Sequence, residues 1–453
     1  MIVLKFGGTS VGTPEAIRRT ASIVGTRRPQ APVVVVSALG GATNALLEIA
    51  DLAARGQLIG ALRGVEALRE RHLAAVDELL GATDDARELG AEVSARVDEL
   101  ASLAEALSVL GDLTPRSKDA IASFGEQLSS LICVAAFRRE GLPAEHVDAR
   151  EVMITDATFT KAEPQLDLIT ERARDLVAPI VREGRIPVLG GFIGSSRDGG
   201  ITTTLGRGGS DYSASLFGAA LHAEAIEIWT DVDGMLTADP RVVQGAQLID
   251  VIGFDEASEL ASFGAKVLHP STIAPAVRVG IPVFVLNSHN PSCPGTRITF
   301  EAPRRAVTAI AGKSGVTLIK VRSTRMLLTE GFLRQLFDVF ERNRTSVDVV
   351  ATSEVSVSLT VDDASRLDDL MAGLRTLGDV AVERNRGIVA IVGAGLSDGA
   401  LAMSRALQAT GDTRVHMLSL SATGINLTLV VDGDQVHPLM RRLHAQFFGE
   451  GAR

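Results

Sequence analysis

Cysteine is scarce in this chain of 453 residues. Its two cysteines, Cys133 and Cys293, cannot build a disulfide framework and lack the spacing of metal ligands. Cys133 lies in an apolar helical run, so we expect it to pack in a core. The histidines His72, His146 and His222 are also scattered, and the sequence therefore predicts no metal site built from side chains.

Two further absences restrict the class of protein. No run of about 18 uninterrupted apolar residues occurs, and Met1 opens a short strand and glycine turn rather than a signal-peptide pattern. We therefore expect a cytoplasmic protein. Positive net charge is absent as well, because 55 acidic residues against 45 basic ones give −10. This balance argues against nucleic acid or an anionic membrane as the main partner.

The first 300 residues show the pattern of an α/β domain. The chain as a whole is long enough for about two to four domains with full cores. Buried-strand runs alternate with helical patterns, which is typical of a parallel sheet covered by helices. Residues 45–140 form a helical excursion, broken near Gly81 and at 111–115. The clearest strands are 2–6, 33–37, 186–189, 225–230 and 283–286.

Beyond a Pro- and Gly-rich boundary near residue 300, shorter elements follow. One β-α-β-β-α-β round covers about 316–385, and a second round, 386–453, is one strand short of a ferredoxin-like unit. A spare strand at 306–312 fills that gap. The order therefore predicts that the first module is inserted into the second, within a region 306–453.

The first glycine-rich turn follows the opening strand, in the run KFGGTSVG. Gly7 and Gly8 let backbone N–H groups approach an anion closely, and Lys5 adds a mobile positive charge. The P-loop pattern G-x-x-x-x-G-K-[ST] does not occur. The residues alone therefore predict a polyphosphate site of another kind.

A second glycine-rich segment ends in TLGRGGSD, residues 204–211, followed by a helix. N–H groups of the turn and of the helix N-terminus would face a phosphate, and Arg207 would donate charge-assisted hydrogen bonds to it. Asp211 is placed to orient a basic residue or to assist proton movement. Since phosphoryl transfer depends mostly on positioning and electrostatics, these two segments are sufficient for it.

These motifs, with SFGE at 123–126, TDVDG at 230–234 and FGAKVLHP at 263–270, occur in an order that resembles the aspartate kinases of the amino-acid kinase superfamily. The resemblance spans nearly the whole chain. It implies a three-layer α/β/α sandwich with a mostly parallel sheet over residues 1–300, followed by two C-terminal ferredoxin-like ACT modules that sense a small ligand. A ferredoxin-like pair used only for dimerisation is the open alternative.

The resemblance also implies roles for individual residues. Glu126, which we expect where one helix stops and another resumes at Gln127, would bind the α-amino group of the substrate. The alternative is a first-turn residue that complements the helix dipole. The catalytic residues would be Lys5, Arg207 and Asp211, and the substrate-binding residues would be Thr43, Glu126, Arg207 and Ser210.

The nucleotide would be ATP, with Mg²⁺ bridging its phosphates. Many relatives have a tyrosine where this chain has Leu236, so a ring contact to the nucleotide is lost there. His269 is expected to be structural. The nucleotide ligands would be Lys5, Gly7, Gly8, Thr230, Asp231, Arg241 and Lys266.

The implied reaction converts ATP and L-aspartate into ADP and 4-phospho-L-aspartate, the first step of lysine, threonine and methionine biosynthesis. The β-carboxylate is ionised at neutral pH, so no strong general base is required. Two alternatives stay open: a kinase for another acid of the superfamily, and an amino-acid sensor with an inactive kinase domain.

Feedback control by an amino acid at the ACT modules follows from the same resemblance. Lysine is the first expectation, and threonine, or two effectors together, remain open. A homodimer through the ACT modules is the default, with a tetramer as the alternative. Asp348 and Glu354 would hold a cationic side chain, unless they are solvated strand ends. The effector residues would be Met326, Thr329, Phe332, Leu333, Val347, Asp348, Ser353 and Glu354.

Overall fold

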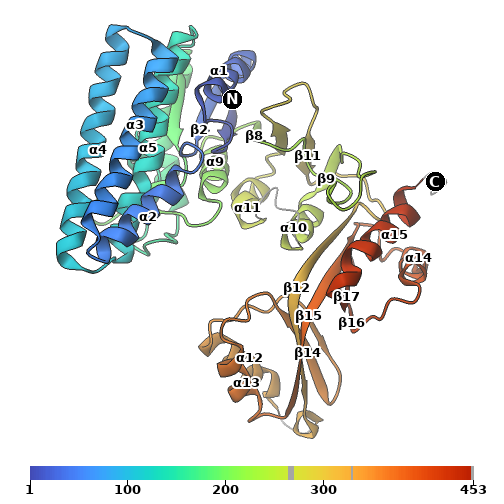
Figure 1. The fold of residues 1–453 in the computed structure, drawn as a ribbon. Coiled ribbons are helices and arrows are strands. Elements are labelled where there is room, and N and C mark those ends of the chain that lie inside the picture. Colours follow the sequence, from blue (N-terminus) through green and yellow to red (C-terminus); the bar gives the residue numbers. More distant parts are fainter. Residues whose placement is uncertain (264–269, 328–329, 450–453) are drawn as a thin grey trace. The chain divides into compact units, whose positions relative to one another are not determined.

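The computed structural model describes residues 1–263, 270–327 and 330–449 (Figure 1). The chain forms two compact units. The first unit comprises residues 1–235 and 267–300, and the second comprises 236–266 and 301–453.

The core of the first unit is a mostly parallel sheet. Its strand order is β3-β5-β2-β1-β8-β10-β11, and within it only β11 runs antiparallel to its neighbour. Strands β1 and β2 are buried along their whole length, as expected where helices cover both faces of a sheet. The five strands predicted from the sequence are confirmed to within one residue. The bounds are β1 Ile2–Phe6, β2 Pro32–Val36, β3 Ala144–Val147, β5 Ile186–Gly190, β8 Ala225–Thr230, β10 Val283–Asn287 and β11 Thr296–Thr299.

Helices complete a three-layer α/β/α sandwich, which confirms the predicted fold class. The helical excursion is a group of long helices, breaking near Gly81 and Gly111 as predicted (Figure 1). A small sheet, β4-β6-β7, lies outside the main one. The remaining bounds are α1 Pro14–Arg27, α2 Ala42–Ala54, α3 Leu58–Leu80, α4 Asp84–Leu110, α5 Pro115–Arg139, β4 Ile154–Thr155, α6 Ala149–Val152, α7 Leu166–Arg172, α8 Ala178–Arg182, β6 Ile193–Ser196, β7 Thr202–Thr204, α9 Gly209–Ala220 and α11 Pro270–Arg278.

Helix α5 corrects one prediction. The helix is continuous, so Glu126 lies in its middle rather than after a helix stop. Gly125, next to Glu126, serves close packing: a Cβ there would lie 2.7 Å from the Cβ of Ala38 and 3.3 Å from a methyl group of Leu46. Cys133 is buried in the same helix, as predicted. In the described part of the chain α5 alone is apolar and long enough to cross a bilayer, yet 83% of its apolar window is buried inside the protein, as in a core helix.

The second unit is built on an antiparallel sheet of order β13-β14-β12-β15-β17-β16. Strands β12 and β15 have 14 residues each and run through two modules, each with its own hydrophobic cluster. Segments that we expected as separate strands are therefore joined, with register shifts after Ser314. The bounds are β12 Ala309–Arg322, α12 Phe332–Arg342, β13 Val350–Thr352, β14 Ser356–Val361, α13 Leu367–Leu374, β15 Asp379–Val392, α14 Ala400–Thr410, β16 Met417–Leu420, β17 Asn426–Asp432 and α15 Val436–Phe448.

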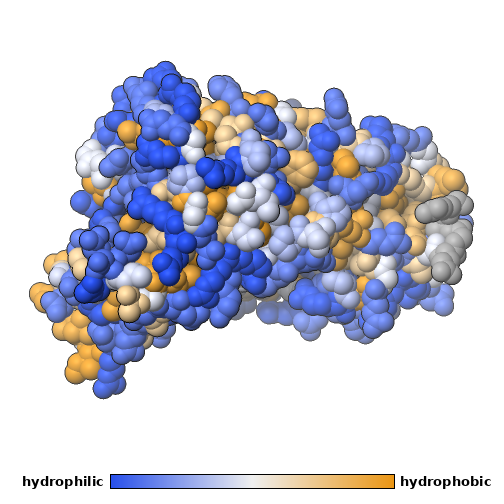
Figure 2. Space-filling model, turned by 90° about the horizontal axis from the view of Figure 1, so that it is seen from above, coloured by the Kyte–Doolittle hydropathy of each residue, from blue (hydrophilic) through white to orange (hydrophobic). Residues whose placement is uncertain are grey.

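Residues 236–263 pack with the second unit, although they precede the predicted boundary near 300. They include β9, Val251–Gly253, and α10, Phe254–Ser262. The buried carboxylate of Glu256 accepts hydrogen bonds from the Thr308 hydroxyl (2.6 Å) and the Ala394 N–H (2.9 Å). The predicted domain limits are drawn along the sequence and do not anticipate this packing. The face of the molecule in Figure 2 is predominantly hydrophilic, with apolar side chains in small groups.

Candidate active site

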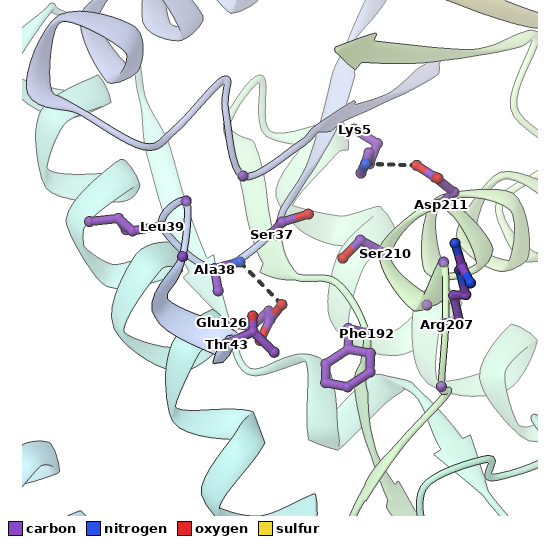
Figure 3. A pocket seen from close by; sticks show the side chains of 16 residues that line it. Lys5, Ser37, Ala38, Leu39, Thr43, Glu126, Phe192, Arg207, Ser210 and Asp211 are labelled. Atoms are coloured by element: carbon purple, nitrogen blue, oxygen red, sulfur yellow. Dashed lines mark hydrogen bonds and ion pairs between the residues drawn. The ribbon is translucent and has the colours of Figure 1, made fainter. Parts of the chain in front are cut away.

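A cavity of about 380 Å³ lies in the first unit, at the carboxyl ends of β1, β2 and β5 (Figure 3). This edge of a parallel sheet is where α/β proteins bind ligands. The cavity brings together Lys5, Gly8, Thr43, Glu126, Arg207, Ser210 and Asp211 from the predicted set. Its other lining residues are Ser37, Ala38, Leu39, Gly40, Gly41, Phe192, Gly206, Gly208 and Gly209.

Lys5 and Asp211 form a largely buried ion pair in this cavity. Lys5 lies on β1 between β2 and β8, and its ammonium is 2.7 Å from Oδ1 of Asp211, in the first turn of α9. Their side chains are 10% and 16% exposed. Because such charges are costly without partners, the pair fixes the lysine toward the cavity.

The two glycines of the first turn differ in what they offer a phosphate. The N–H of Gly7 donates to the carbonyl oxygen of Trp229 (3.1 Å), so this amide is already occupied, and Gly7 does not line the cavity. Gly8 does line it. A Cβ on Gly8 would lie 3.1 Å from the carbonyl oxygen of Ala38, so the close approach of two loops requires glycine there. The prediction that the Gly7 amide faces a phosphate is thus corrected.

The second glycine-rich turn presents the amino end of α9 to the cavity. Gly206 and Gly208 have φ of 76° and 73°, in the left-handed region that favours glycine. Arg207 lies between them, and no residue in the described part of the chain forms an ion pair with it. The amino end of α9 and this guanidinium together suit a phosphate or a carboxylate.

Glu126 is the most unusual group of the cavity. It is 3% exposed, and its Oε1 accepts a hydrogen bond from the Ala38 N–H (3.1 Å). Its Oε2 is buried without a hydrogen-bond partner among the described residues. Burial raises the pKa of this carboxyl to about 8, although the Ala38 N–H and the charge of Lys5 oppose the shift. A cation in the cavity would satisfy Oε2 and restore ionisation, so the site suits an ammonium group.

Phe192 is a cavity residue that sequence reasoning missed. Its φ of 65° is unusual for a residue other than glycine. The Ser213 hydroxyl accepts its N–H (2.9 Å), and its carbonyl accepts the Leu205 N–H (2.9 Å), which holds the strained backbone. The ring faces the cavity between the Glu126 and Arg207 sides (Figure 3). A lone aromatic residue within a glycine-rich run was the signal available in the sequence.

The predicted nucleotide residues fall in different parts of the structure. Thr230 is the last residue of β8, the strand that pairs with β1, and it donates its hydroxyl to the carboxylate of Asp231 (3.1 Å). Arg241 belongs to the second unit, where it is exposed and pairs with Asp239 (2.7 Å). The predicted residues Lys266 and His269 lie outside the described residues.

The predicted effector residues belong to the first module of the second unit. Met326, Phe332 and Val347 share one hydrophobic cluster, whereas Leu333 is 40% exposed. Ser353 and Glu354 lie between β13 and β14, and Thr329 is outside the described residues.

Asp348 is not a freely solvated strand end. Its carboxylate is 3.4 Å from the ammonium of Lys313, which is also 2.7 Å from Asp362. Burial raises the pKa of Asp348 to about 6, with the Lys313 charge opposing and the Asp362 charge adding to the shift. This carboxylate is therefore partly desolvated and already lies beside a cation of this chain, Lys313. No cluster of three or more metal-ligating side chains occurs among the residues that the structure describes.

The fold and the cavity define a phosphotransferase: a buried lysine, an arginine and a helix N-terminus converge at the strand ends of an α/β sheet. The sequence model of the amino acid kinase family matches residues 1–287. Lysine-sensitive aspartokinase 3 of Escherichia coli is 37% identical over 461 residues and is matched over 99% of both chains. Aspartokinase 2 of Arabidopsis thaliana chloroplasts is 37% identical, over 98% of this chain and 84% of its own.

Solved structures agree. Crystal structures of Escherichia coli aspartokinase III, one with lysine and aspartate and one with aspartate and ADP, both have a TM-score of 0.84. Their sequences are 36% and 37% identical to this chain. Each match covers 99% of this chain, and 99% and 100% of the two solved chains, respectively. The chain belongs to the aspartokinases of the amino acid kinase family. The predicted family, fold class and enzyme class are thereby confirmed.

Proposed function

We propose that this chain transfers the γ-phosphoryl group of ATP to the β-carboxylate of L-aspartate, forming 4-phospho-L-aspartate. The observation that supports this most is the buried Oε2 of Glu126, which has no hydrogen-bond partner among the described residues, on one side of the cavity, with Arg207 and Ser210 on the other (Figure 3). The ammonium group of aspartate would bind Glu126, and its carboxylates would bind Arg207 and Ser210. Thr43, in the first turn of α2, completes the substrate set.

The chemical step requires little beyond positioning. An oxygen of the β-carboxylate bonds to the γ-phosphorus, and the bond from that phosphorus to the bridging oxygen of ATP breaks, leaving ADP. The nucleophile is already ionised, so no proton is transferred. Lys5 and Arg207 stabilise the charge on the transferring group, and Asp211 orients Lys5 through their ion pair.

The residues around the first turn suit the phosphates of ATP. Lys5 and Gly8 face the cavity, and Thr230 and Asp231 lie at the carboxyl end of β8, the neighbour of β1. We assign the remaining nucleotide contacts to Arg241 and Lys266. Mg²⁺, when bound with ATP through phosphate oxygens, would neutralise part of their charge.

We further propose that L-lysine inhibits the enzyme by binding at the ACT modules. Asp348 and Glu354 would bind its ammonium groups, and Met326, Phe332 and Val347 would contact its aliphatic chain. A relative of 37% identity is named lysine-sensitive, and its structure contains lysine and aspartate together. Lysine would favour a conformation with lower affinity for a substrate, which couples two distinct sites. The remaining effector contacts would come from Thr329, Leu333 and Ser353.

A homodimer through the ACT modules, or a tetramer of such dimers, is the proposed assembly, and the cytoplasm is the proposed location. These two proposals rest on the sequence and on the ACT-like topology of the second unit.

The experiment that tests the catalytic proposal is trapping of the acyl phosphate with hydroxylamine, with ATP and L-aspartate, at increasing L-lysine. We expect hydroxamate that requires aspartate and decreases as lysine rises. Product unaffected by lysine would refute the effector proposal and direct the search to threonine. Absence of product with aspartate but ATP still bound would favour the sensor, whereas product with another acid would favour a different substrate.

A further inference from the structure

Helix α5 carries a second buried carboxylate, for which the reaction described above has no role. Asp119 precedes Glu126 by seven residues, so it lies on the same face of the helix, about two turns earlier. It is 1% exposed. In the part of the chain that the structure describes, no lysine or arginine forms an ion pair with Asp119. A buried carboxylate of this kind must be compensated by hydrogen bonds.

Three hydrogen bonds compensate it, and they come from two separate segments. Oδ2 accepts the N–H of Thr160 (2.8 Å) and the N–H of Thr204 (3.0 Å). Oδ1 accepts the hydroxyl of Thr204 (2.7 Å). Thr204 is the last residue of β7, and the turn that carries Arg207 follows directly. Asp119 therefore holds the base of that turn against α5.

The segment that contains Thr160 also supports the turn that carries Arg207. The N–H of Ala162 donates to the carbonyl oxygen of Thr204 (2.9 Å). Gly206 is so close to this segment that a Cβ on it would lie 3.0 Å from the carbonyl oxygen of Thr160. Thr160 itself has a φ of 70°, a conformation that a threonine adopts only when its surroundings hold it there. Asp119 is one of the groups that does so.

We propose that Asp119 is a positioning residue for aspartate binding: it fixes the Arg207 turn to the helix that carries Glu126. The inference rests on the proposed function, in which Glu126 and Arg207 bind opposite ends of one substrate. Helix α5 then sets both ends, Glu126 directly and Arg207 through Asp119 and Thr204. If the turn could shift, the Arg207 guanidinium would still be present, but its distance from Glu126 would no longer match the length of aspartate.

The test is Asp119→Asn. The amide oxygen can keep the N–H groups of Thr160 and Thr204, which both bind Oδ2, but these bonds are no longer charge-assisted. The amide nitrogen cannot accept the Thr204 hydroxyl that Oδ1 accepts, so that bond is lost or reversed. We expect the KM for aspartate to rise about 10-fold or more, since the lost positioning acts on the bound substrate. The KM for ATP should change less than about 3-fold, since Lys5 and Gly8 are untouched. Hydrogen exchange of the Thr160 and Thr204 amides should accelerate, a readout that is independent of activity.

Two further variants separate positioning from general destabilisation. Thr204→Ser keeps the hydroxyl and should retain the wild-type KM for aspartate, whereas Thr204→Val removes one bond and should raise it, in case Asp119→Asn does not fold. Asp156→Asn is the matched control, because this carboxylate binds the Thr158 and Glu163 N–H groups within the same segment but not β7.

Three results would overturn the proposal. These are an unchanged KM for aspartate in folded Asp119→Asn, an equal rise in Asp156→Asn, or a parallel loss of ATP affinity. If wild-type enzyme does not phosphorylate aspartate at all, the proposed function fails instead. The exchange of the two amides then still shows whether Asp119 holds the turn.

Discussion

Replacing Glu126 by glutamine should weaken substrate binding and stabilise the free protein at the same time. The change keeps the shape of the side chain and removes its charge. Removing one partner of a buried, hydrogen-bonded charge pair costs about 2–5 kcal/mol of binding. At about 1.4 kcal/mol for each factor of ten, kcat/KM for aspartate should fall by roughly 30-fold to more than 10³-fold.

Stability should move in the opposite direction. Burial raises the pKa of Glu126 from 4.5 to about 8. A carboxyl whose pKa is raised by folding contributes its stability below the unfolded pKa and loses it as pH rises through the folded pKa. Over that window the loss is at most about 5 kcal/mol, at 1.36 kcal/mol per pKa unit. Glutamine does not titrate, so the variant should gain in Tm relative to wild type between pH 5 and pH 8, and most at pH 8.

The assays are hydroxamate formation against aspartate concentration and thermal unfolding at several pH values. Glu140→Gln, an exposed carboxylate at the end of the same helix, is the control and should change neither quantity. Unaltered kcat/KM for aspartate in Glu126→Gln would refute the assignment of Glu126 to the ammonium group. A lower Tm at pH 8 would refute the reasoning on its burial.

Four other substitutions test three separate parts of the structure. Lys5→Met should lower kcat by about 10²–10³-fold, because one group that stabilises the charge on the transferring phosphoryl group is lost. Asp211→Asn should lower kcat by less. Equal kcat values in wild type and Lys5→Met would contradict the role of this pair. Asp348→Asn should raise the lysine concentration needed for half-inhibition. In wild type this concentration should also rise below pH 6, where Asp348 becomes protonated. The variant should lack this dependence on pH. Gly125→Ala should cost about 1–3 kcal/mol of unfolding free energy in urea denaturation, because its Cβ would lie 2.7 Å from that of Ala38; wild-type stability would show that the loop moves away freely.

Several features of this protein are readable from short stretches of sequence. The apolar runs that form β1, β2 and β8 are buried on both sides, and burial of this kind leaves a local pattern. The two glycine-rich turns are equally local, because positive φ at Gly206 and Gly208 is a property of those residues. The order of the motifs was sufficient to predict the family and the fold class.

Other features depend on contacts between distant segments, which no local pattern specifies. The sequence predicted a helix stop before Glu126, whereas α5 is continuous there and Gly125 lets it pack closely against Ala38, which is distant in sequence. The sequence suggested that the amide of Gly7 is available to a phosphate, whereas in the structure it donates a hydrogen bond to the carbonyl oxygen of Trp229. The roles of Phe192 and Asp119 arise only where β7, α5 and α9 meet.

The sequence by itself thus determined the elements, the family and seven of the sixteen cavity residues, because strand burial, turn geometry and motif order depend on neighbouring residues. The tertiary structure alone decided which charges lose water. Glu126 has a pKa of about 8, and Asp119 is compensated by hydrogen bonds from residues about 40 and 85 positions away in sequence. Desolvation depends on everything that packs around a group, and that surrounding is assembled only when the chain has folded.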